Sequence, residues 1–385
     1  MRRRRRWRRE KHSLLFYILL GCGLILVAGL LMYARRPPRH TPPASPVPIP
    51  QQSPAPAPRQ PPAPVPAPVS PRPQATPSSV TVLFAPTTPE APAGIDDHLI
   101  ALINSARKSV LCAFYDLELQ SVADALVAQD HSGRKVAIVT DSEYRDRPAL
   151  RSCAAAGIPI VFDRRSPFMH NKFCIVDGKT VWTGSTNISN NCMYRNNNNA
   201  LLLQSPELAE RYGAEFTEMF NGRRFGGGVR SASREPVLVG TTPITSYFAP
   251  EDEVEQVLVG LVKGARNRIE FMAFSFTSKP VAQEMVQRIQ DRVRVRGIFE
   301  RRNAGSEASR DDFLRARGAD VRLDGNPYNL HHKVIVIDGA TTITGSYNFS
   351  RNANTRNDEN LLVLQGADIA AAYLEEFERL FAAAS

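Results

Sequence analysis

His170-Asn-Lys-Phe-Cys-Ile-Val-Asp177 is followed closely by Gly184-Ser-Thr-Asn187, and these two pieces decide how the chain is interpreted. A second copy reads His331-His-Lys-Val-Ile-Val-Ile-Asp338 and then Gly345-Ser-Tyr-Asn348. Every element of the second copy lies 161 residues after its counterpart in the first. One short His-x-Lys pattern arises easily by chance, but two complete copies in one register indicate a duplicated unit that carries a functional motif twice.

Each copy predicts a buried strand and a hairpin. The apolar, β-branched runs Phe173–Val176 and Val334–Ile337 are typical of strands in a sheet interior. Side chains two apart on a strand share a face, so the His and the Lys of each motif point the same way. The Asp-Gly pairs at 177–178 and 338–339 predict tight turns. The returning strands then bring the Ser and Asn of each Gly-Ser-x-Asn segment beside the same site.

The chemistry of this set suits a phosphodiester. Two imidazoles, two ammonium groups and four polar side chains converge when the two copies meet. One His would attack phosphorus and the other would protonate the leaving oxygen, while Lys, Ser and Asn would hold the phosphoryl oxygens.

At these residues the sequence resembles the phospholipase D superfamily, whose signature is two H-x-K-x4-D-x6-G-S-x-N motifs. The resemblance covers the chain from Val80 to the C-terminus. It implies an α/β fold with two duplicated α/β/α sandwich domains of phospholipase D type, related by a pseudo-twofold axis. It also implies one active site between the two halves, without metal or cofactor, and a covalent phosphohistidine intermediate.

The resemblance is carried over residue by residue. The catalytic set of the two motifs is His170, Lys172, Asp177, His331, Lys333 and Asp338. Within it the two His are nucleophile and general acid, and the two Lys bind phosphate together with Ser185, Asn187, Ser346 and Asn348. Asp177 and Asp338 end their strands away from the site, so we expect a structural role for them.

One departure from the family pattern separates the two copies. The family usually has an acidic residue after Gly-Ser-x-Asn that hydrogen-bonds the His of its own motif. The second copy has Glu359 at this place and the first has Asn198. A carboxylate favours the charged imidazolium and an amide does so much less, so we expect His331 to be the general acid and His170 the nucleophile. In the alternative, Asn198 only hydrogen-bonds neutral His170 and has no role of its own.

The net charge of +10 comes from one end of the chain. Residues 1–40 hold eleven Lys and Arg and one acidic residue, and the remaining 345 residues carry 37 basic and 37 acidic side chains. A catalytic region that grips long nucleic acid usually has a clear basic excess. The neutral balance of this region therefore does not favour a nucleic-acid substrate.

Three segments precede the folded part. Residues 1–12 form a basic head, and residues 13–34 predict a transmembrane signal-anchor helix, with 21 uncharged residues from Leu14 to Ala34. The larger basic excess before the span predicts a single-pass protein with a cytoplasmic N-terminus and the catalytic part outside. A cleaved signal peptide is the alternative. Residues 35–78 predict a disordered linker, with Pro at 18 of the 41 positions 37–77.

The remaining chain predicts two domains, residues 79–225 and 236–385. Strands are expected at Val80–Phe84, Val110–Tyr115 and Lys135–Thr140, with helices at Asp96–Arg107 and Ser121–Gln129 between them. This alternation is typical of layered α/β domains. Ser205 followed by Pro206 predicts the start of a further helix. His332, between the His and Lys of the second motif, is expected to face the opposite side of its strand.

The five cysteines show no metal-binding spacing, so no zinc site is expected. Four of them fall in the folded part: Cys112, Cys153, Cys174 and Cys192. They are either buried thiols or, if this part is exported, disulfide partners, and both interpretations stay open.

The sequence therefore predicts a membrane-tethered phosphoric diester hydrolase that cleaves phospholipids and releases phosphatidic acid. The bilayer anchor and the neutral catalytic region favour a phospholipid. Three alternatives stay open: a metal-independent endonuclease on DNA or RNA, a phosphatidyltransferase of the cardiolipin-synthase type, and an inactive extracellular binding module. Intact His and Lys in both motifs argue against the last of these.

Overall fold

The computed structural model describes residues 79–87, 93–230 and 233–385. These residues all belong to one unit of the chain, Pro73–Ser385. The predicted basic head, membrane helix and proline-rich linker (residues 1–78) lie outside the described residues. Among the helices that are described, none has both the length and the apolar character that a bilayer span needs.

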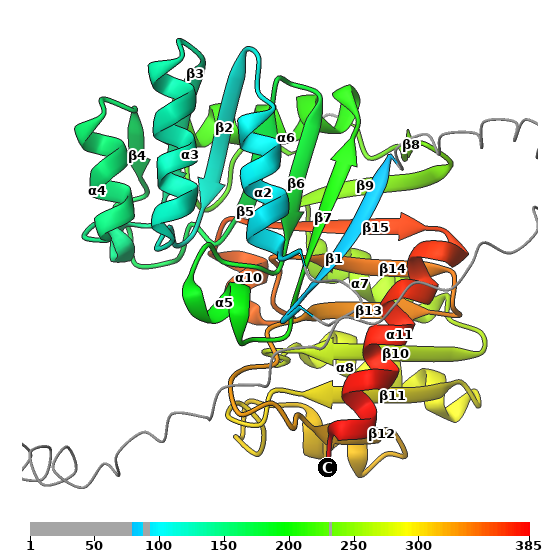
Figure 1. Cartoon of the computed structure of the whole chain (residues 1–385). Helices are drawn as coiled ribbons and strands as arrows, with labels where there is room; N and C mark the ends of the chain where they lie inside the picture. Colours follow the sequence, from blue (N-terminus) through cyan, green and yellow to red (C-terminus); the bar gives the residue numbers. More distant parts are fainter. Residues whose placement is uncertain (1–78, 88–92, 231–232) are drawn as a thin grey trace, which may run out of the picture. The chain divides into compact units, whose positions relative to one another are not determined.

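The first half is built on a seven-stranded sheet in the order β1-β7-β6-β5-β2-β3-β4 (Figure 1). Its strands are β1 Val80–Ala85, β2 Ser109–Phe114, β3 Lys135–Thr140, β4 Ile160–Phe162, β5 Lys172–Val176, β6 Thr180–Gly184 and β7 Asn198–Gln204. β2, β3 and β4 are parallel neighbours, and β5 pairs antiparallel with β2. The strand of the first motif, β5, therefore lies in the middle of the sheet.

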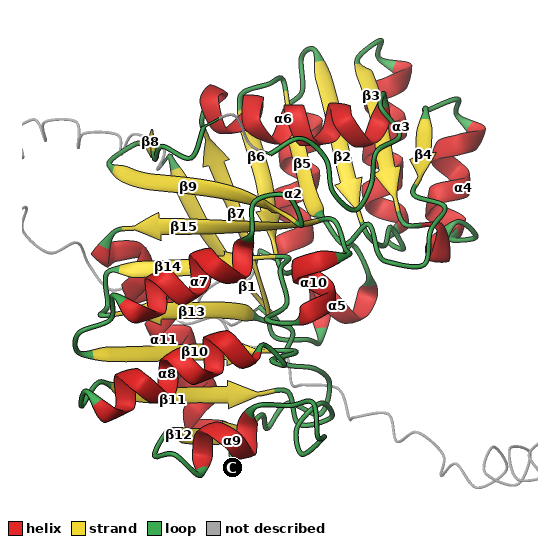
Figure 2. Cartoon of the chain, turned by 180° about the vertical axis from the view of Figure 1, so that it is seen from behind, coloured by secondary structure: helices red, strands yellow, loops and turns green. Residues whose placement is uncertain are grey.

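Helices cover both faces of this sheet (Figures 1 and 2). α2 Ile95–Asn104, α3 Gln120–His131 and α4 Pro148–Ala155 pack on one face, and α6 Pro206–Phe220 packs on the other. Two short helices, η1 Ser142–Tyr144 and α5 Asn190–Tyr194, lie in loops. Cys174 and Val176 of β5 enter the core under α2 and α3, whereas Phe173 and Ile175 enter the core under α6. The predicted α/β/α layering is confirmed.

The second half repeats this plan on an eight-stranded sheet in the order β12-β11-β10-β13-β14-β15-β9-β8. Its strands are β8 Val237–Val239, β9 Thr242–Ala249, β10 Arg268–Ala273, β11 Arg294–Phe299, β12 Asp320–Leu323, β13 Lys333–Ile337, β14 Thr341–Gly345 and β15 Glu359–Gln365. α7 Val254–Lys263, α8 Lys279–Gln290 and α9 Asp311–Arg315 cover one face, and α11 Ala367–Ala383 covers the other (Figure 2). The short helix α10 Arg351–Thr355 precedes β15.

The two halves share part of their core. The core under α6 also contains Leu362 and Leu364 of β15 in the other half. In the same way, Tyr373 of α11 packs edge-on against Phe84 of β1, with ring centroids 5.2 Å apart. Each long C-terminal helix thus contacts both its own sheet and a strand of the other half. Separating the halves would expose this apolar surface to water, so the hydrophobic effect holds them together.

The turns and helix starts that the sequence predicts are present. Asp177 and Gly178 have φ of 56° and 62°, and Asp338 and Gly339 have 53° and 65°, as a hairpin turn with two left-handed residues requires. At the start of α6, the Ser205 hydroxyl accepts the Leu208 N–H at 3.2 Å and Pro206 is the first helical residue.

One predicted helix is shorter than expected. The helix expected over Asp96–Arg107 ends at Asn104. The N–H groups of Ser105 and Ala106 still donate to helix carbonyls, but those of Arg107 and Lys108 donate to the Asp177 carboxylate at 2.9 and 2.7 Å. Because a side chain from the hairpin takes these donors, the segment forms a turn and not another helical turn.

Candidate active site

Both motifs begin central strands, β5 and β13. His170 and His331 precede these strands and are 7% and 6% exposed, and Lys172 and Lys333 begin them and are each 1% exposed. Each Lys Nζ donates to the main-chain oxygen of its own motif's His, at 2.6 Å in the first half and 2.7 Å in the second. The structure thus brings the His and Lys of each motif together, as strand geometry predicts.

An aromatic ring supports each His–Lys pair. The Tyr115 ring lies 4.8 Å from the His170 ring and 4.9 Å from the Lys172 ammonium. In the second half, Phe274 lies 4.8 Å from His331 and 4.8 Å from the Lys333 ammonium. A ring face attracts an ammonium group, so the two rings hold the lysines in matching positions.

The chain segments around the two His cross between the halves. Met169 forms a parallel β-bridge with Asp358, and Leu330 forms one with Asn197. Consequently the His170 N–H donates to the Asp358 oxygen at 2.9 Å, and the His331 N–H donates to the Asn197 oxygen at 2.8 Å. Each bridge places the next residue of one half, 359 or 198, beside the His of the other half.

This crossing makes the expected pairing of Glu359 with His331 wrong. Glu359 Oε2 lies 2.7 Å from His170 Nδ1, and Asn198 Oδ1 lies 2.8 Å from His331 Nδ1. The alternative in which Asn198 hydrogen-bonds His170 is wrong for the same reason. The sequence analysis took the His beside the carboxylate as the general acid, because a carboxylate favours the charged imidazolium. In the structure that His is His170. The argument therefore no longer supports His331 as the general acid and His170 as the nucleophile.

The electrostatics of the two His differ accordingly. Burial lowers the pKa of His170 to about 4, and the charge of Glu359 opposes this shift. Burial lowers the pKa of His331 well below its usual value, and Lys333, Lys172 and His170 lower it further. Lys172 and His170 belong to the other motif, and the contacts His170–Glu359 and His331–Asn198 bring the two motifs together at one site.

The site as a whole is electropositive. Burial lowers the pKa of Lys172 to about 8 and that of Lys333 well below its usual value. Burial also disfavours charge on Glu359, but His170, Lys172 and Ser346 outweigh it and lower the pKa of this carboxyl. One carboxylate therefore faces two lysines and two histidines. An anion bound among them would offset the cost of burying the ammonium groups.

The Ser and Asn of the Gly-Ser-x-Asn segments take different positions. Ser185 Oγ donates to Asn198 Oδ1 at 3.0 Å, and Ser346 Oγ donates to Glu359 Oε2 at 2.7 Å. The serines therefore hold the partners of the two His. The side-chain oxygens of Asn187 and Asn348 are buried and have no hydrogen-bond partner among the described residues. An unpaired buried polar atom is costly, so each of these oxygens is left to accept a hydrogen bond from a ligand.

Asp177 and Asp338 do not join the site. Asp177 accepts main-chain N–H groups of residues 107–109, and Asp338 accepts those of residues 266–268. At about 3.3 Å per residue, the length of β5 puts Asp177 roughly 16 Å from Lys172. Both carboxylates hold the loop before the neighbouring strand. Contacts of this kind hold a loop in place, which is the role expected for both residues from the sequence.

Two carboxylates that the sequence analysis missed hold the segments before the two His. Asp141 Oδ2 accepts the Met169 N–H at 2.9 Å, and Glu300 Oε2 accepts the Leu330 N–H at 2.6 Å. Each carboxylate directly follows an equivalent strand, β3 or β11. An acidic residue directly after β3 and again after β11 was the available signal.

The residue between His and Lys in each motif joins the two halves. His332 faces away from its motif's site, as predicted: its Nδ1 lies 3.0 Å from Asn199 Nδ2 and its Nε2 3.4 Å from Glu376 Oε1. In the first half, Asn171 Oδ1 accepts from Asn360 Nδ2 at 2.9 Å. The His332–Asn199 and Asn171–Asn360 contacts cross between the halves, and they lie behind the site.

Another pair of equivalent contacts between the halves is an ion pair at one place and a neutral hydrogen bond at the other. Arg165 forms an ion pair with the buried Asp358, which also accepts the Gly226 N–H at 2.6 Å. At the equivalent place in the other half, Asn326 Nδ2 donates to Asn197 Oδ1 at 2.7 Å. At these two equivalent places the first half thus has an ion pair and the second half a pair of amides.

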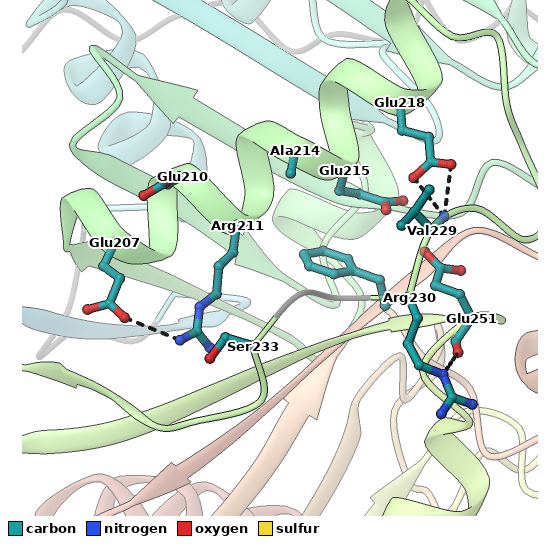
Figure 3. A pocket seen from close by; sticks show the side chains of 11 residues that line it. Glu207, Glu210, Arg211, Ala214, Glu215, Glu218, Val229, Arg230, Ser233 and Glu251 are labelled. Carbon is teal, nitrogen blue, oxygen red and sulfur yellow. Dashed lines mark hydrogen bonds and ion pairs between the residues drawn. The ribbon is translucent and has the colours of Figure 1, made fainter.

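A cavity of about 370 Å³ lies along α6, and its lining contains none of the motif His and Lys residues (Figure 3). Five glutamates and two arginines line it: Glu207, Glu210, Glu215, Glu218, Glu251, Arg211 and Arg230. Burial raises the pKa values of Glu215 and Glu251. Carboxyl groups outnumber guanidinium groups in this lining, so the cavity does not favour a phosphodiester.

Comparison with known proteins agrees with the geometry. The family model described as "Cardiolipin synthase, PLD-like domain" matches residues 99–220 and 258–381. A mitochondrial cardiolipin hydrolase of Xenopus laevis is 33% identical over 147 residues, which are 38% of this chain and 70% of that protein. A phospholipase D of Rickettsia bellii (strain RML369-C) is 28% identical over 134 residues, 35% of this chain and 67% of that protein.

Among solved structures, the phosphatidylserine synthase of Haemophilus influenzae Rd KW20 superposes with a TM-score of 0.60. It covers 79% of this chain and 86% of its own, at 15% sequence identity. At this identity the likeness shows the two-sheet fold alone.

Proposed function

The chain belongs to the phospholipase D superfamily, and from this membership we propose that it hydrolyses phospholipid phosphodiester bonds and releases phosphatidic acid. The observation that carries the proposal is the convergence of two His–Lys pairs, in which each His Nδ1 meets an acceptor from the other half. The relatives named cardiolipin hydrolase and phospholipase D support a phospholipid substrate. The membrane anchor predicted at residues 13–34 supports the same class.

The substrate phosphate would bind between the two motifs. Lys172 and Lys333 would balance its negative charge, and the side-chain N–H groups of Asn187 and Asn348 would donate to its oxygens. A bound anion also raises the pKa of both nearby imidazoles. The complex can therefore carry the one proton that the leaving group needs.

We assign the nucleophile to His170. The argument is the charge of the phosphorylated ring, and it replaces the earlier argument from the charge of the unphosphorylated ring. The two possible assignments start from the same resting protein and differ in which ring is charged once the phosphoenzyme has formed. A ring phosphorylated on Nε2 that keeps its Nδ1–H is a cation. At His170 this cation would face the Glu359 carboxylate, and at His331 it would face the neutral amide of Asn198. A buried charge that keeps its partner is favoured by several kcal/mol over one without.

His331 would then serve as general acid and afterwards as general base. It gives its Nε2 proton to the leaving oxygen as His170 attacks phosphorus. The deprotonated ring next takes a proton from water while the water oxygen attacks phosphorus. The P–N bond to His170 breaks, and phosphatidic acid leaves. If an alcohol replaced water in this second step, the product would be a new phosphatidyl ester, so hydrolysis and phosphatidyl transfer share every earlier step.

The test uses the full-length chain in the presence of EDTA. The protein is incubated in parallel with vesicles of cardiolipin and phosphatidylcholine and with labelled single-stranded DNA and RNA. The inactive control is His170→Ala. A matched active control is His332→Asn, because Asn171 occupies the equivalent place in the first half and His332 lies behind the site.

We expect phosphatidic acid with the wild type and with His332→Asn, and none with His170→Ala. Cleaved oligonucleotide with intact lipid would replace the proposal by the endonuclease alternative. Phosphatidyl esters of an added alcohol without phosphatidic acid would indicate a transferase. If the wild type turned over none of these substrates, the binding-module alternative would stand.

A further inference from the structure

Two cysteines face each other inside the first half. Cys112 on β2 and Cys174 on β5 are directly opposite in an antiparallel pair. Their Sγ atoms are 3.2 Å apart, and both side chains are fully buried. Neither is in a disulfide in this structure.

The ladder around this pair favours close approach of the two side chains. The Tyr115 N–H donates to the Asn171 oxygen, and the Asp177 N–H donates to the Ser109 oxygen. These opposite pairs are hydrogen-bonded, and the cysteine pair lies three positions from each of them. Because hydrogen-bonded and non-hydrogen-bonded pairs alternate, the cysteines form a non-hydrogen-bonded pair, with Cα atoms about 4.5 Å apart. This spacing lies within the range of roughly 4.4–6.8 Å found for disulfides.

Packing does not require thiols at this place. In the second half, Phe271 and Ile335 are the corresponding opposite residues. They are buried in the core under α7 and α8, as the cysteines are buried under α2 and α3. The same fold therefore fills this position with hydrocarbon side chains in its other copy.

We propose that Cys112 and Cys174 form a disulfide bond by thiol–disulfide exchange as the chain folds. The thiolate of one cysteine attacks an oxidant disulfide, such as oxidised glutathione or a protein disulfide, and expels one thiolate. The second cysteine thiolate then attacks the mixed disulfide and expels the other thiolate. The two cysteine sulfurs are oxidised, the oxidant disulfide is reduced to two thiols, and the two protons of the cysteines pass to those thiols.

Burial sets the time at which the reaction can occur. No oxidant reaches two fully buried sulfurs, and burial also raises the pKa of the Cys112 thiol. The exchange therefore takes place before α2 and α3 cover the sheet. The bond would join residues 62 positions apart in the chain, and it would fix the register in which Lys172 lies opposite Phe114. Restricting the unfolded chain in this way stabilises the folded state.

The experiment compares two refolding conditions for the full-length chain. The protein is unfolded and reduced, then refolded either with excess reductant or in a mixture of reduced and oxidised glutathione. Free thiols are blocked with iodoacetamide, and the unreduced protein is digested and analysed by mass spectrometry. Cys174→Val removes one partner with a residue of the kind that the second half uses, and Cys153→Ala is the matched control.

We expect a linked peptide pair containing Cys112 and Cys174 only after oxidative refolding. The midpoint of thermal unfolding should be several degrees higher for the oxidised wild type than for the reduced one. Cys153→Ala should keep this difference, and Cys174→Val should lose it. Alkylation of both cysteines after oxidative refolding, or a link from Cys112 to another cysteine, would overturn the proposal.

A second measurement covers the case in which the chain does not refold. Folded protein is held in the glutathione mixture at a denaturant concentration that opens the sheet transiently, and is then unfolded and alkylated. Linked Cys112 and Cys174 would support the proposal. Full alkylation of both would contradict it.

Discussion

Replacing Glu359 by Asn gives both candidate catalytic histidines the same neutral partner and should slow phosphoenzyme formation by about 160-fold. The chain itself shows that the fold accepts asparagine here. Asn198, at the equivalent place, has its Oδ1 2.8 Å from His331 Nδ1 and 3.0 Å from the Ser185 hydroxyl. Its Nδ2 donates to the Cys192 oxygen at 3.0 Å. The substitution therefore removes the charge opposite His170 and leaves a hydrogen-bond acceptor within reach.

The magnitude follows from the charge of the intermediate. A phosphorylated His170 is a cation, and Glu359, fully buried, lies 2.7 Å from its Nδ1. Removing one partner of a buried ion pair costs about 3–5 kcal/mol. The remaining amide acceptor keeps a neutral hydrogen bond, worth about 1 kcal/mol, so we take the lower limit of about 3 kcal/mol. At 1.36 kcal/mol per factor of ten, this is a loss of about 160-fold in rate.

The assay measures the first chemical step without knowledge of the natural substrate. Wild type and Glu359→Asn are mixed rapidly with bis(p-nitrophenyl) phosphate, and the burst of p-nitrophenolate reports phosphoenzyme formation. A separate sample with a radiolabelled phosphodiester is quenched in alkali, which preserves phosphohistidine, and the labelled peptide is identified. The double variant Glu359→Asn with Asn198→Glu exchanges the two partners, and it should move the label from His170 to His331.

Two results would refute the reasoning. The first is a label on His331 in the wild type. The second is a burst rate of Glu359→Asn within threefold of the wild type, when thermal unfolding and inorganic phosphate affinity show a folded and intact site. Either would mean that the buried carboxylate does not stabilise a charged ring at His170.

Three further predictions follow from the geometry. His331→Ala should still release a burst of p-nitrophenolate, because this leaving group departs without protonation. The same variant should fail to turn over an alkyl phosphodiester. Loss of the burst would contradict the general-acid role of His331. Asp177→Ala should lower the free energy of unfolding by about 2 kcal/mol, because it removes the acceptor of main-chain N–H groups at residues 107–109. A fall in kcat beyond twofold, measured at a temperature where the variant is folded, would contradict the structural role of Asp177. The pKa of His170 is lowered to about 4 in the folded protein, so only the unfolded chain gains this proton as the pH falls from about 6.5 to 4. Unfolding free energy should therefore drop by about 3 kcal/mol more in wild type than in His170→Gln over that window, and parallel pH curves for the two proteins would contradict the prediction.

Local sequence was sufficient for the secondary structure around the motifs. The apolar runs after each His-x-Lys become β5 and β13, and the Asp-Gly pairs become left-handed turns. Ser205 and Pro206 start α6 as expected. In each case the deciding interactions lie within a few residues along the chain, so the pattern of side chains carries the information.

The sequence missed features that depend on contacts between distant segments. The helix after Asp96 ends early because the Asp177 carboxylate takes the N–H groups of residues 107–109. Asp141 holds the segment before His170 although 29 residues separate them in the chain. Of the four cysteines in the folded part, only the sheet register identifies Cys112 and Cys174 as opposite neighbours.

The duplicated His–Lys motif and the duplicated α/β fold follow from the order of residues, because the motif occurs twice with a spacing of 161 residues. The acceptor that each histidine meets depends on how the two halves pack. Duplication gives each His two equivalent candidates, Asn198 and Glu359, and spacing along the chain favours the one in the same half. The β-bridges Met169–Asp358 and Leu330–Asn197 cross between the halves instead. The buried carboxylate therefore faces His170, and the charge asymmetry of the site arises from this contact between distant segments.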